Sequence, residues 1–142
     1  MPRALLFRLG AAHYGLEIGA IQEVADDPVL YAVPQGGACL LGAVSLHGRV
    51  LPVIDLPALL DQAAGPRDRR LIVLSPEFHG LALAVSGVGR ITTYAVDDVR
   101  PPAAAERSRA IAGVVETGGR EGAVGLLDAG AVVARLQTIY AK

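Results

Sequence analysis

The residues that could carry chemistry are few and widely spaced along this 142-residue chain. The histidines His13, His47 and His79 each fall in an expected turn. None has a second histidine four positions later, and there is no cysteine pair, so the spacing does not indicate a metal site. Cys39 is the single cysteine of the chain and lies in an apolar run, where a thiol usually acts as a small buried hydrophobe.

Motifs for nucleophilic catalysis and for phosphate binding are missing from the sequence. None of the serines lies in a GxSxG elbow, and Gly87-x-Gly89 is too short for a dinucleotide fingerprint. The adjacent acids Asp26-Asp27 stand beside a proline, where solvated carboxylates are expected. The sequence therefore predicts a protein that is not an enzyme and that holds neither a metal nor a cofactor.

Two charged segments allow both a functional and a structural interpretation. Glu23 stands in the otherwise apolar segment from Ile21 to Val24, and the two interpretations are evenly balanced for it. Residues 67–70 form the densest charge cluster, which could bind an acidic partner. A solvated connector is the favoured interpretation of that cluster.

Composition limits the fold and the partners of the chain. Apolar residues make up 52% of the sequence, and 17 glycines with 9 prolines indicate a turn-rich globular protein without long helices. The formal net charge is -1, which favours neither nucleic acid nor an anionic membrane surface as a partner. The single cysteine fits a reducing compartment. A strand-like run begins close to Met1 in place of a signal sequence, so we expect a cytoplasmic protein with no membrane insertion.

Short apolar runs bounded by turn residues dominate the chain, and their spacing is typical of an all-β sandwich or barrel. The runs cover residues 4–9, 14–18, 43–46, 49–54, 70–74, 80–85, 111–116 and 123–127. A hairpin turn is expected at His47-Gly48, and strands adjacent in sequence are expected to pair antiparallel. Helices are expected at 57–61 and 129–141, with Asp55 and Asp128 as their N-caps.

The two halves of the chain repeat the same order of elements. Each has a strand that begins near a glycine, a hairpin and a second strand that ends in Asp55 or Asp128 before a helix. We interpret this as two similar small barrels of about five strands each, connected by residues 62–69. A groove between the barrels is the expected place for a partner.

These residues resemble the CheW-like domain, the family of coupling adaptors in bacterial chemosensory arrays. The resemblance covers essentially the whole chain. The matching segments are Phe7-x-Leu9-Gly10, Tyr14-Gly15-Leu16-Glu17-Ile18, Ile21-x-Glu23-Val24, Val33-Pro34, residues 42–48 and 50–56, and, in the second half, 71–74, 80–88 and 111–128.

The resemblance implies a mainly β fold of two five-stranded SH3-like barrels packed together, with short helices that include a C-terminal one. It implies a single domain over residues 1–142 made of two intertwined subdomains, with a change near residues 62–70. It also implies a non-catalytic scaffold in the cytoplasm. Such a scaffold links the cytoplasmic tip of a methyl-accepting chemoreceptor to the regulatory domain of a CheA-type histidine kinase and so associates with membrane receptor arrays.

Residues are carried over from the family one by one. Ile21, Glu23 and Gly42 match positions implicated in partner contact. The apolar residues Ile21, Val24, Val85 and Val88 are expected to be exposed in the groove, where they would receive the receptor tip. The complete expected partner-binding set is Ile21, Glu23, Val24, Gly42, Ser45, His47, Val85 and Val88.

The sequence departs from the family at the hairpin. His47 replaces a signature arginine and Ser45 an asparagine, and Ser86 stands where the family has an acid. Histidine, with an ordinary pKa of about 6.5, lacks the permanent charge and the bidentate geometry of arginine. We therefore expect an alternative chemosensory system, for example one that steers type IV pilus twitching.

Two other classes of function remain open. A small β-barrel that binds RNA or single-stranded DNA would need a basic groove with stacking aromatic residues. The net charge of -1 and the low aromatic content, with 2 phenylalanines, 4 tyrosines and no tryptophan, speak against this class. A different protein-interaction module would share the fold without the chemosensory partners.

Overall fold

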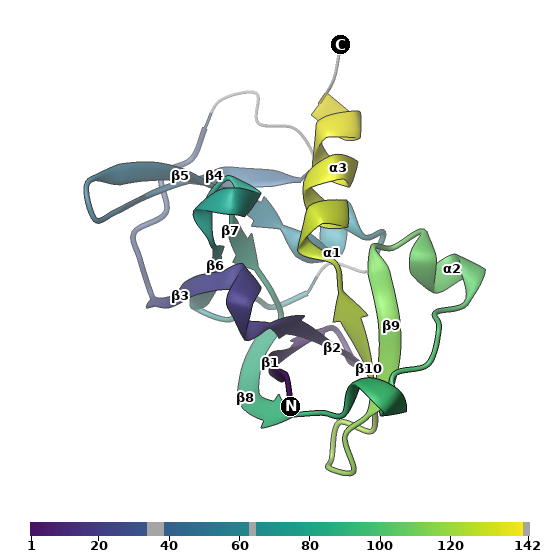
Figure 1. Ribbon diagram of the computed structural model, residues 1–142. Helices are drawn as coiled ribbons and strands as arrows, with labels where there is room; N and C mark the ends of the chain where they lie inside the picture. The colour runs from purple at the N-terminus through teal and green to yellow at the C-terminus, as the bar shows by residue number, and fades with distance from the viewer. Residues whose placement is uncertain (34–38, 63–64, 141–142) are drawn as a thin grey trace.

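The computed structural model describes residues 1–33, 39–62 and 65–140. These residues form ten strands in two five-stranded sheets (Figure 1). The first sheet has the order β8-β1-β2-β10-β9. Its strands are β1 (Arg3–Leu9), β2 (Ala12–Glu17), β8 (Gly87–Thr93), β9 (Ile111–Glu116) and β10 (Ala123–Leu127).

The second sheet has the order β3-β6-β7-β5-β4. Its strands are β3 (Ile21–Asp26), β4 (Leu40–Leu46), β5 (Arg49–Asp55), β6 (Arg70–Leu74) and β7 (Ala82–Ala84). Six short helical segments accompany the sheets over the described residues: η1 (Ile18–Ala20), α1 (Leu56–Leu59), η2 (Pro76–Phe78), η3 (Val96–Asp98), α2 (Ala104–Arg107) and α3 (Ala129–Tyr140). The predicted mainly β fold of two five-stranded barrels with a C-terminal helix is confirmed.

Strands that are hairpin neighbours in sequence pair antiparallel as expected, but two pairs are parallel. β10 runs parallel to its partner β2, and β7 runs parallel to its partner β5. Two strands, β3 and β8, lie outside the predicted runs. β3 carries three acidic or amide side chains, and most of β8 is exposed, so neither shows a continuous apolar run.

The chain crosses between the sheets twice. It leaves the first sheet at η1, after two strands, and returns to it between β7 and β8. The switch between subdomains was expected near residues 62–70. The chain does not change sheet there, because β5 and β6 on either side both lie in the second sheet. β1 and β2 pair with strands from the C-terminal part of the chain, so the sheets do not correspond to sequence halves.

One apolar core joins both sheets and the C-terminal helix. It takes Leu5, Phe7, Leu9 and Leu16 from the first sheet, Ile54, Ile72, Leu74 and Leu83 from the second, and Ala129 and Val132 from α3. The rings of Phe7 and Tyr14 stack with their centroids 5.9 Å apart. Because the sheets bury their apolar faces against each other, neither retains a core of this size without the other.

Only one of the two expected N-caps makes a capping bond. The backbone N–H of Ala131 donates to Oδ1 of Asp128 at 3.2 Å, which confirms Asp128 as the cap of α3. Asp55 occupies the N-cap position of α1, as predicted, but its side chain makes no capping hydrogen bond. Pro57 lies in the first turn of α1 and has no N–H to donate.

Arg135 attaches α3 to the rest of the molecule. Its guanidinium donates to the carbonyl oxygens of Leu59 at 2.6 Å and Ser108 at 2.7 Å and pairs with Asp61 at 2.8 Å. Among the described residues, none of the helices has the length and apolar content needed to cross a membrane.

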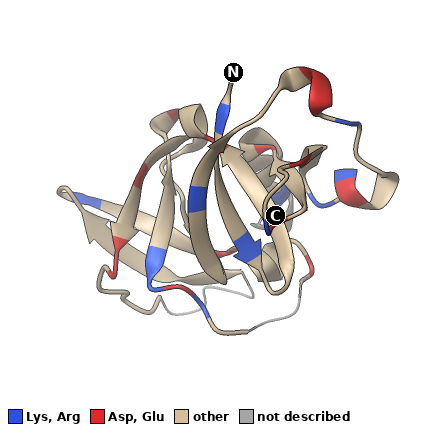
Figure 2. Cartoon of the chain, turned by 90° about the horizontal axis from the view of Figure 1, so that it is seen from below, with Lys and Arg blue, Asp and Glu red and all other residues tan. Residues whose placement is uncertain are grey.

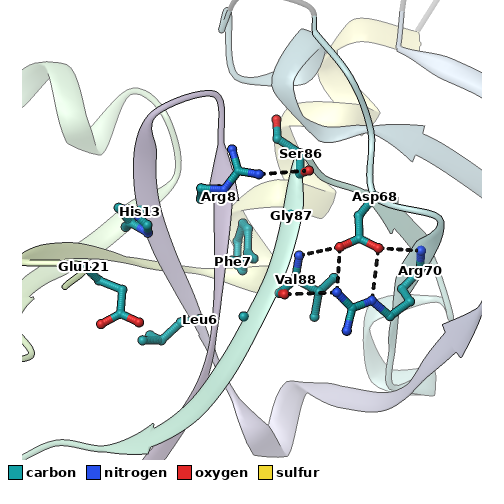
Figure 3. A pocket seen from close by; sticks show the side chains of 11 residues that line it. Leu6, Phe7, Arg8, His13, Asp68, Arg70, Ser86, Gly87, Val88 and Glu121 are labelled. Atoms are coloured by element: carbon teal, nitrogen blue, oxygen red, sulfur yellow. Dashed lines mark hydrogen bonds and ion pairs between the residues drawn. The ribbon is translucent and has the colours of Figure 1, made fainter. Parts of the chain in front are cut away.

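A largely buried carboxylate side chain, that of Asp68, ties the two sheets together (Figure 3). Asp68 accepts hydrogen bonds from the backbone N–H of Val88 in β8 at 2.8 Å and of Arg70 in β6 at 2.9 Å. It also accepts from Nε and Nη2 of Arg70, and the same guanidinium donates to the Val88 carbonyl at 3.2 Å. We call this set of bonds the inter-sheet clamp.

The clamp changes the interpretation of residues 67–70. Arg67 and Arg69 are exposed as expected of a solvated connector, but the Asp68 side chain is only 11% exposed. Hydrogen bonds from the Arg70 guanidinium, and then from the backbone amides of Val88 and Arg70, hold the pKa of Asp68 well below its usual range. Asp68 therefore stays ionised and keeps the clamp closed over the pH range in which proteins function.

Asp68→Asn is expected to lower the free energy of unfolding by about 2 kcal/mol at neutral pH, because it removes the charge that four donors face. The folded-state pKa lies below the unfolded value of about 3.9, so the contribution is complete above that pH. It is lost as the pH falls further. Urea unfolding followed by circular dichroism should show the difference from wild type shrink below about pH 4.

Asp26→Asn is the control for this experiment. Its exposed pair with Arg69 has side chains 68% and 69% exposed and should contribute less than about 1 kcal/mol. Equal losses in the two variants would contradict the role of the clamp.

Candidate partner-binding site

A pocket of about 370 Å³ opens on the second sheet between β3, the segment that follows β3 and the β4–β5 hairpin. We call it the hairpin pocket. Its lining includes Glu23, Val24, Val29, Tyr31, Ser45 and His47. The pocket lies where the two edge strands of the sheet, β3 and β4, approach each other without pairing.

The tip of the hairpin has the backbone that was expected. Leu46 pairs with Arg49, which leaves His47 and Gly48 as a two-residue turn. Both have positive φ, 53° and 78°, as a type I′ turn requires. The turn directs the hairpin beyond the body of the sheet, where Figure 1 shows β4 and β5 extending from the molecule.

Two contacts close the open side of the second sheet. Nε2 of His47 lies 2.8 Å from Oε1 of Glu23, which joins the hairpin tip to β3. Tyr31 forms a two-way backbone bridge with Ala43 in β4, with both N···O distances 2.8 Å. The His47 and Glu23 side chains are 69% and 31% exposed, so solvent and a partner can both reach this pair.

Apolar side chains are exposed around the same pocket. Val24, Val29 and Tyr31 line it and are 37%, 66% and 61% exposed. Leu30, Val33 and Val50 on the neighbouring segment and hairpin are also exposed. Most of the exposed large apolar residues in the described ranges thus come from one region, and such a concentration marks an interaction surface.

The charges of the molecule are mixed. Figure 2 shows basic and acidic positions spread over separate strands and loops in that view. At the hairpin pocket, Asp26 lines the wall and accepts from Nε of Arg69 at 3.0 Å. Glu23 and Asp26 give the lining an acidic character.

A second pocket of about 320 Å³ lies beside the inter-sheet clamp (Figure 3). It is bordered by β1, β2 and β8 and by polar groups that include Arg8, His13, Asp68 and Arg70. Arg8 donates to the carbonyl of Gly10 at 2.8 Å. At this place, the recess between the sheets is lined by both polar side chains and apolar ones, which include Leu6 and Phe7.

The expectation that Val85 lies exposed in the groove is wrong. Val85 has no exposed surface, because it points into the core that the sheets share. Val88 is partly buried and packs against the same core, and its backbone belongs to the inter-sheet clamp. Both residues lie where the chain returns to the first sheet.

The other predicted residues divide into two groups. Glu23, Val24, Ser45 and His47 come together around the hairpin pocket. Ile21 is partly buried against the core. Gly42 is buried with a φ of +156°, and a side chain there would collide with the backbone carbonyl of Tyr31.

Val29, Tyr31 and Asp68 were missed by the sequence reasoning. Val29 and Tyr31 belong to an uncharged stretch of the sequence, and nothing in their types separates an exposed valine or tyrosine from a buried one. Asp68 stands among arginines, and its role depends on β8, twenty positions away.

Groups that could perform catalysis are scattered in the structure. Over the described ranges, no three of the His, Cys, Asp and Glu side chains gather as a metal site. Cys39 is buried, and burial raises the pKa of its thiol, which disfavours the reactive thiolate.

The family profile and the similar proteins found by sequence comparison indicate the same family. The CheW-like domain profile matches residues 3–137. The chemotaxis protein CheW of Rhizobium meliloti is 31% identical over 99 residues, which cover 68% of this chain and 64% of that protein. The probable chemotaxis protein CheW of Rhizobium etli is 30% identical over 99 residues with the same coverage. Both matches span less than two thirds of the relative's length.

A solved structure has a similar fold. The scaffolding protein TtCheW from Thermoanaerobacter tengcongensis superimposes with a TM-score of 0.77, over 90% of this chain and 85% of that chain. The sequences are 21% identical, so this likeness concerns the fold alone.

Gly42→Ala is expected to lower the free energy of unfolding by about 2 kcal/mol, because the new methyl group would displace the Tyr31 backbone from β4. Chemical denaturation measures this loss. Gly19→Ala is the control, since the nearest atom to its new methyl is the flexible end of Glu17. A Gly42 variant of unchanged stability but weaker partner binding would show that Gly42 contacts the partner.

Proposed function

The chain belongs to the CheW-like domain family, and from this we propose that it is a non-catalytic adaptor that couples chemoreceptors to a CheA-type histidine kinase. The observation that carries the proposal is the match of the family profile to residues 3–137. The exposed apolar surface around the hairpin pocket supports it, because an adaptor acts through surfaces that bind other proteins.

The hairpin pocket is the proposed face for one of the two partners, either the kinase regulatory domain or the chemoreceptor tip. Val24, Val29 and Tyr31 offer apolar area to bury, at roughly 25 cal/mol per Å². Glu23, Ser45 and His47 add polar groups that fix the orientation of the partner. With Val85 in the core, we do not place the receptor on an aliphatic groove between the sheets.

The adaptor works by geometry in this proposal. Simultaneous binding of receptor and kinase raises their effective concentration and holds the kinase in one arrangement relative to the receptor. The shared core and the inter-sheet clamp support a single domain made of both barrels, which would hold the two partners in a fixed relation to each other. The protein would act in the cytoplasm and reach membrane receptor arrays through its partners.

We place the protein in an alternative chemosensory pathway, for example one that steers type IV pilus twitching. The support is the departure at the hairpin, where His47 occupies the position of the family arginine and pairs with Glu23. Co-purification with a flagellar-type kinase and receptor would argue against this assignment.

Calorimetric titration tests the adaptor role. The purified chain is titrated with the regulatory domain of each CheA-type kinase of the source organism and, separately, with receptor tip fragments. Binding to one kinase and its receptor at about micromolar concentration supports the role and identifies the pathway. Binding to a nucleic acid or to none of these proteins would contradict it.

Val29→Lys is expected to weaken binding of the partner that uses the hairpin pocket by about tenfold or more, because it places a positive charge in the apolar contact. Val96→Lys is the matched control, since both valines are 66% exposed and Val96 lies in η3, away from the pocket. The titrations above measure both variants. Equal weakening by the two would mean that the hairpin pocket is not the binding face.

A further inference from the structure

We propose that the hairpin pocket receives a lysine or arginine side chain of the partner and that protonation of His47 expels it. The inference rests on the proposed partner-binding role of this face and assigns the chemistry of the contact. Binding of the partner to the pocket is then weaker in acid. Three observations carry it: the unbalanced charge of Glu23, the aliphatic walls of the pocket and the position of His47.

The charge of Glu23 is incompletely compensated. Asp26, the other acid of the lining, pairs with Arg69 at 3.0 Å. Glu23 has a bond from His47 to Oε1, and Oε2 makes no hydrogen bond to any described residue. When the imidazole is neutral, the pocket therefore has a carboxylate with a full charge, one unoccupied oxygen and 31% of its side chain exposed.

The walls of the pocket suit a long aliphatic stem that ends in a cation. Val24 and Val29 contribute methyl groups, and Tyr31 contributes an exposed ring. Lysine and arginine bury their methylene chains against such surfaces while the charged end bonds a carboxylate, and a tyrosine face adds a cation–π contact. An acidic side chain would be repelled by Glu23, and a purely apolar one would desolvate the carboxylate without a partner.

His47 competes with this cation. Its side chain is 69% exposed at a hairpin tip, so the imidazole can leave Glu23 without disturbing the core. Histidine gains its charge between about pH 8 and pH 5. A protonated imidazole makes a charge-assisted bond to Glu23 and neutralises it, which removes the attraction for the partner's cation.

The other charged groups near the pair do not reverse this effect. Glu23 and Asp26 face the pocket from β3. In the segment that follows β3, Tyr31 lines the pocket, whereas Asp27 lines a different pocket. Arg69 is engaged by Asp26. Arg49 of the same hairpin points toward Gly80, where its Nη2 would lie 3.7 Å from an added Cβ.

The test uses short peptides and the full chain, so its result does not depend on which kinase or receptor is the partner. Acetyl-Leu-Arg-Leu-amide is titrated into ¹⁵N-labelled protein at about pH 8 and about pH 5.5. The analogues with glutamine or glutamate in the central position are the controls. The amide signals of Glu23, Val24 and His47 report occupancy of the pocket.

The arginine peptide is expected to shift these signals and to bind roughly tenfold more tightly at the higher pH, whereas the two analogues leave the signals unchanged. Glu23→Gln should abolish the response at both pH values. His47→Gln should remove the pH dependence of the response, because glutamine does not titrate in this range. Both exchanges are at polar positions outside the apolar core, and a ¹⁵N spectrum of each variant verifies that it is folded.

The proposal is overturned if the arginine peptide gives no shift up to about 10 mM, if the glutamine analogue binds equally well, or if binding is as tight in acid. A response to the arginine peptide together with no binding of kinase or receptor would retain the pocket chemistry and reject the chemosensory role. Binding of the kinase or the receptor together with no response to the arginine peptide would retain the adaptor role and reject the cation pocket.

Discussion

The fold depends on one constraint: the first sheet is completed only by strands from the far end of the chain. β1 and β2 need β8, β9 and β10 as neighbours, and the second sheet is built in between. The two sheets therefore share an apolar cluster that includes Phe7, Leu74 and Val132, and each sheet also has a smaller cluster of its own. The inter-sheet clamp of Asp68, Arg70 and Val88 fixes the two sheets at the point where the chain returns.

The candidate site lies at the two edge strands of the second sheet. Its edge strands β3 and β4 do not pair, and exposed sheet edges attract other chains. In this protein the gap is spanned by the Tyr31–Ala43 bridge and by the Glu23–His47 pair. The Glu23–His47 pair is solvent-exposed and has valines around it, so partner contacts can replace it at little cost in stability.

Particular residues show how far the sequence could be interpreted. The turn at His47-Gly48 and the cap at Asp128 are local features, fixed by neighbours within four positions, and both were predictable. Val85 was placed on the surface, although it is buried, because a valine at a strand end has the same type and spacing on either face. Asp68 was assigned to solvent because its partner Val88 is distant in the chain.

The sequence by itself determined the mainly β class, the number of barrels, the hairpin turn and the family, since these depend on local periodicity, turn residues and motif order. Only the tertiary structure decided which strands share a sheet and which apolar residues remain exposed. It alone placed Glu23 beside His47, 24 positions apart, and Tyr31 against Gly42. Contacts between distant segments depend on how the whole core packs, and a local pattern does not record that packing.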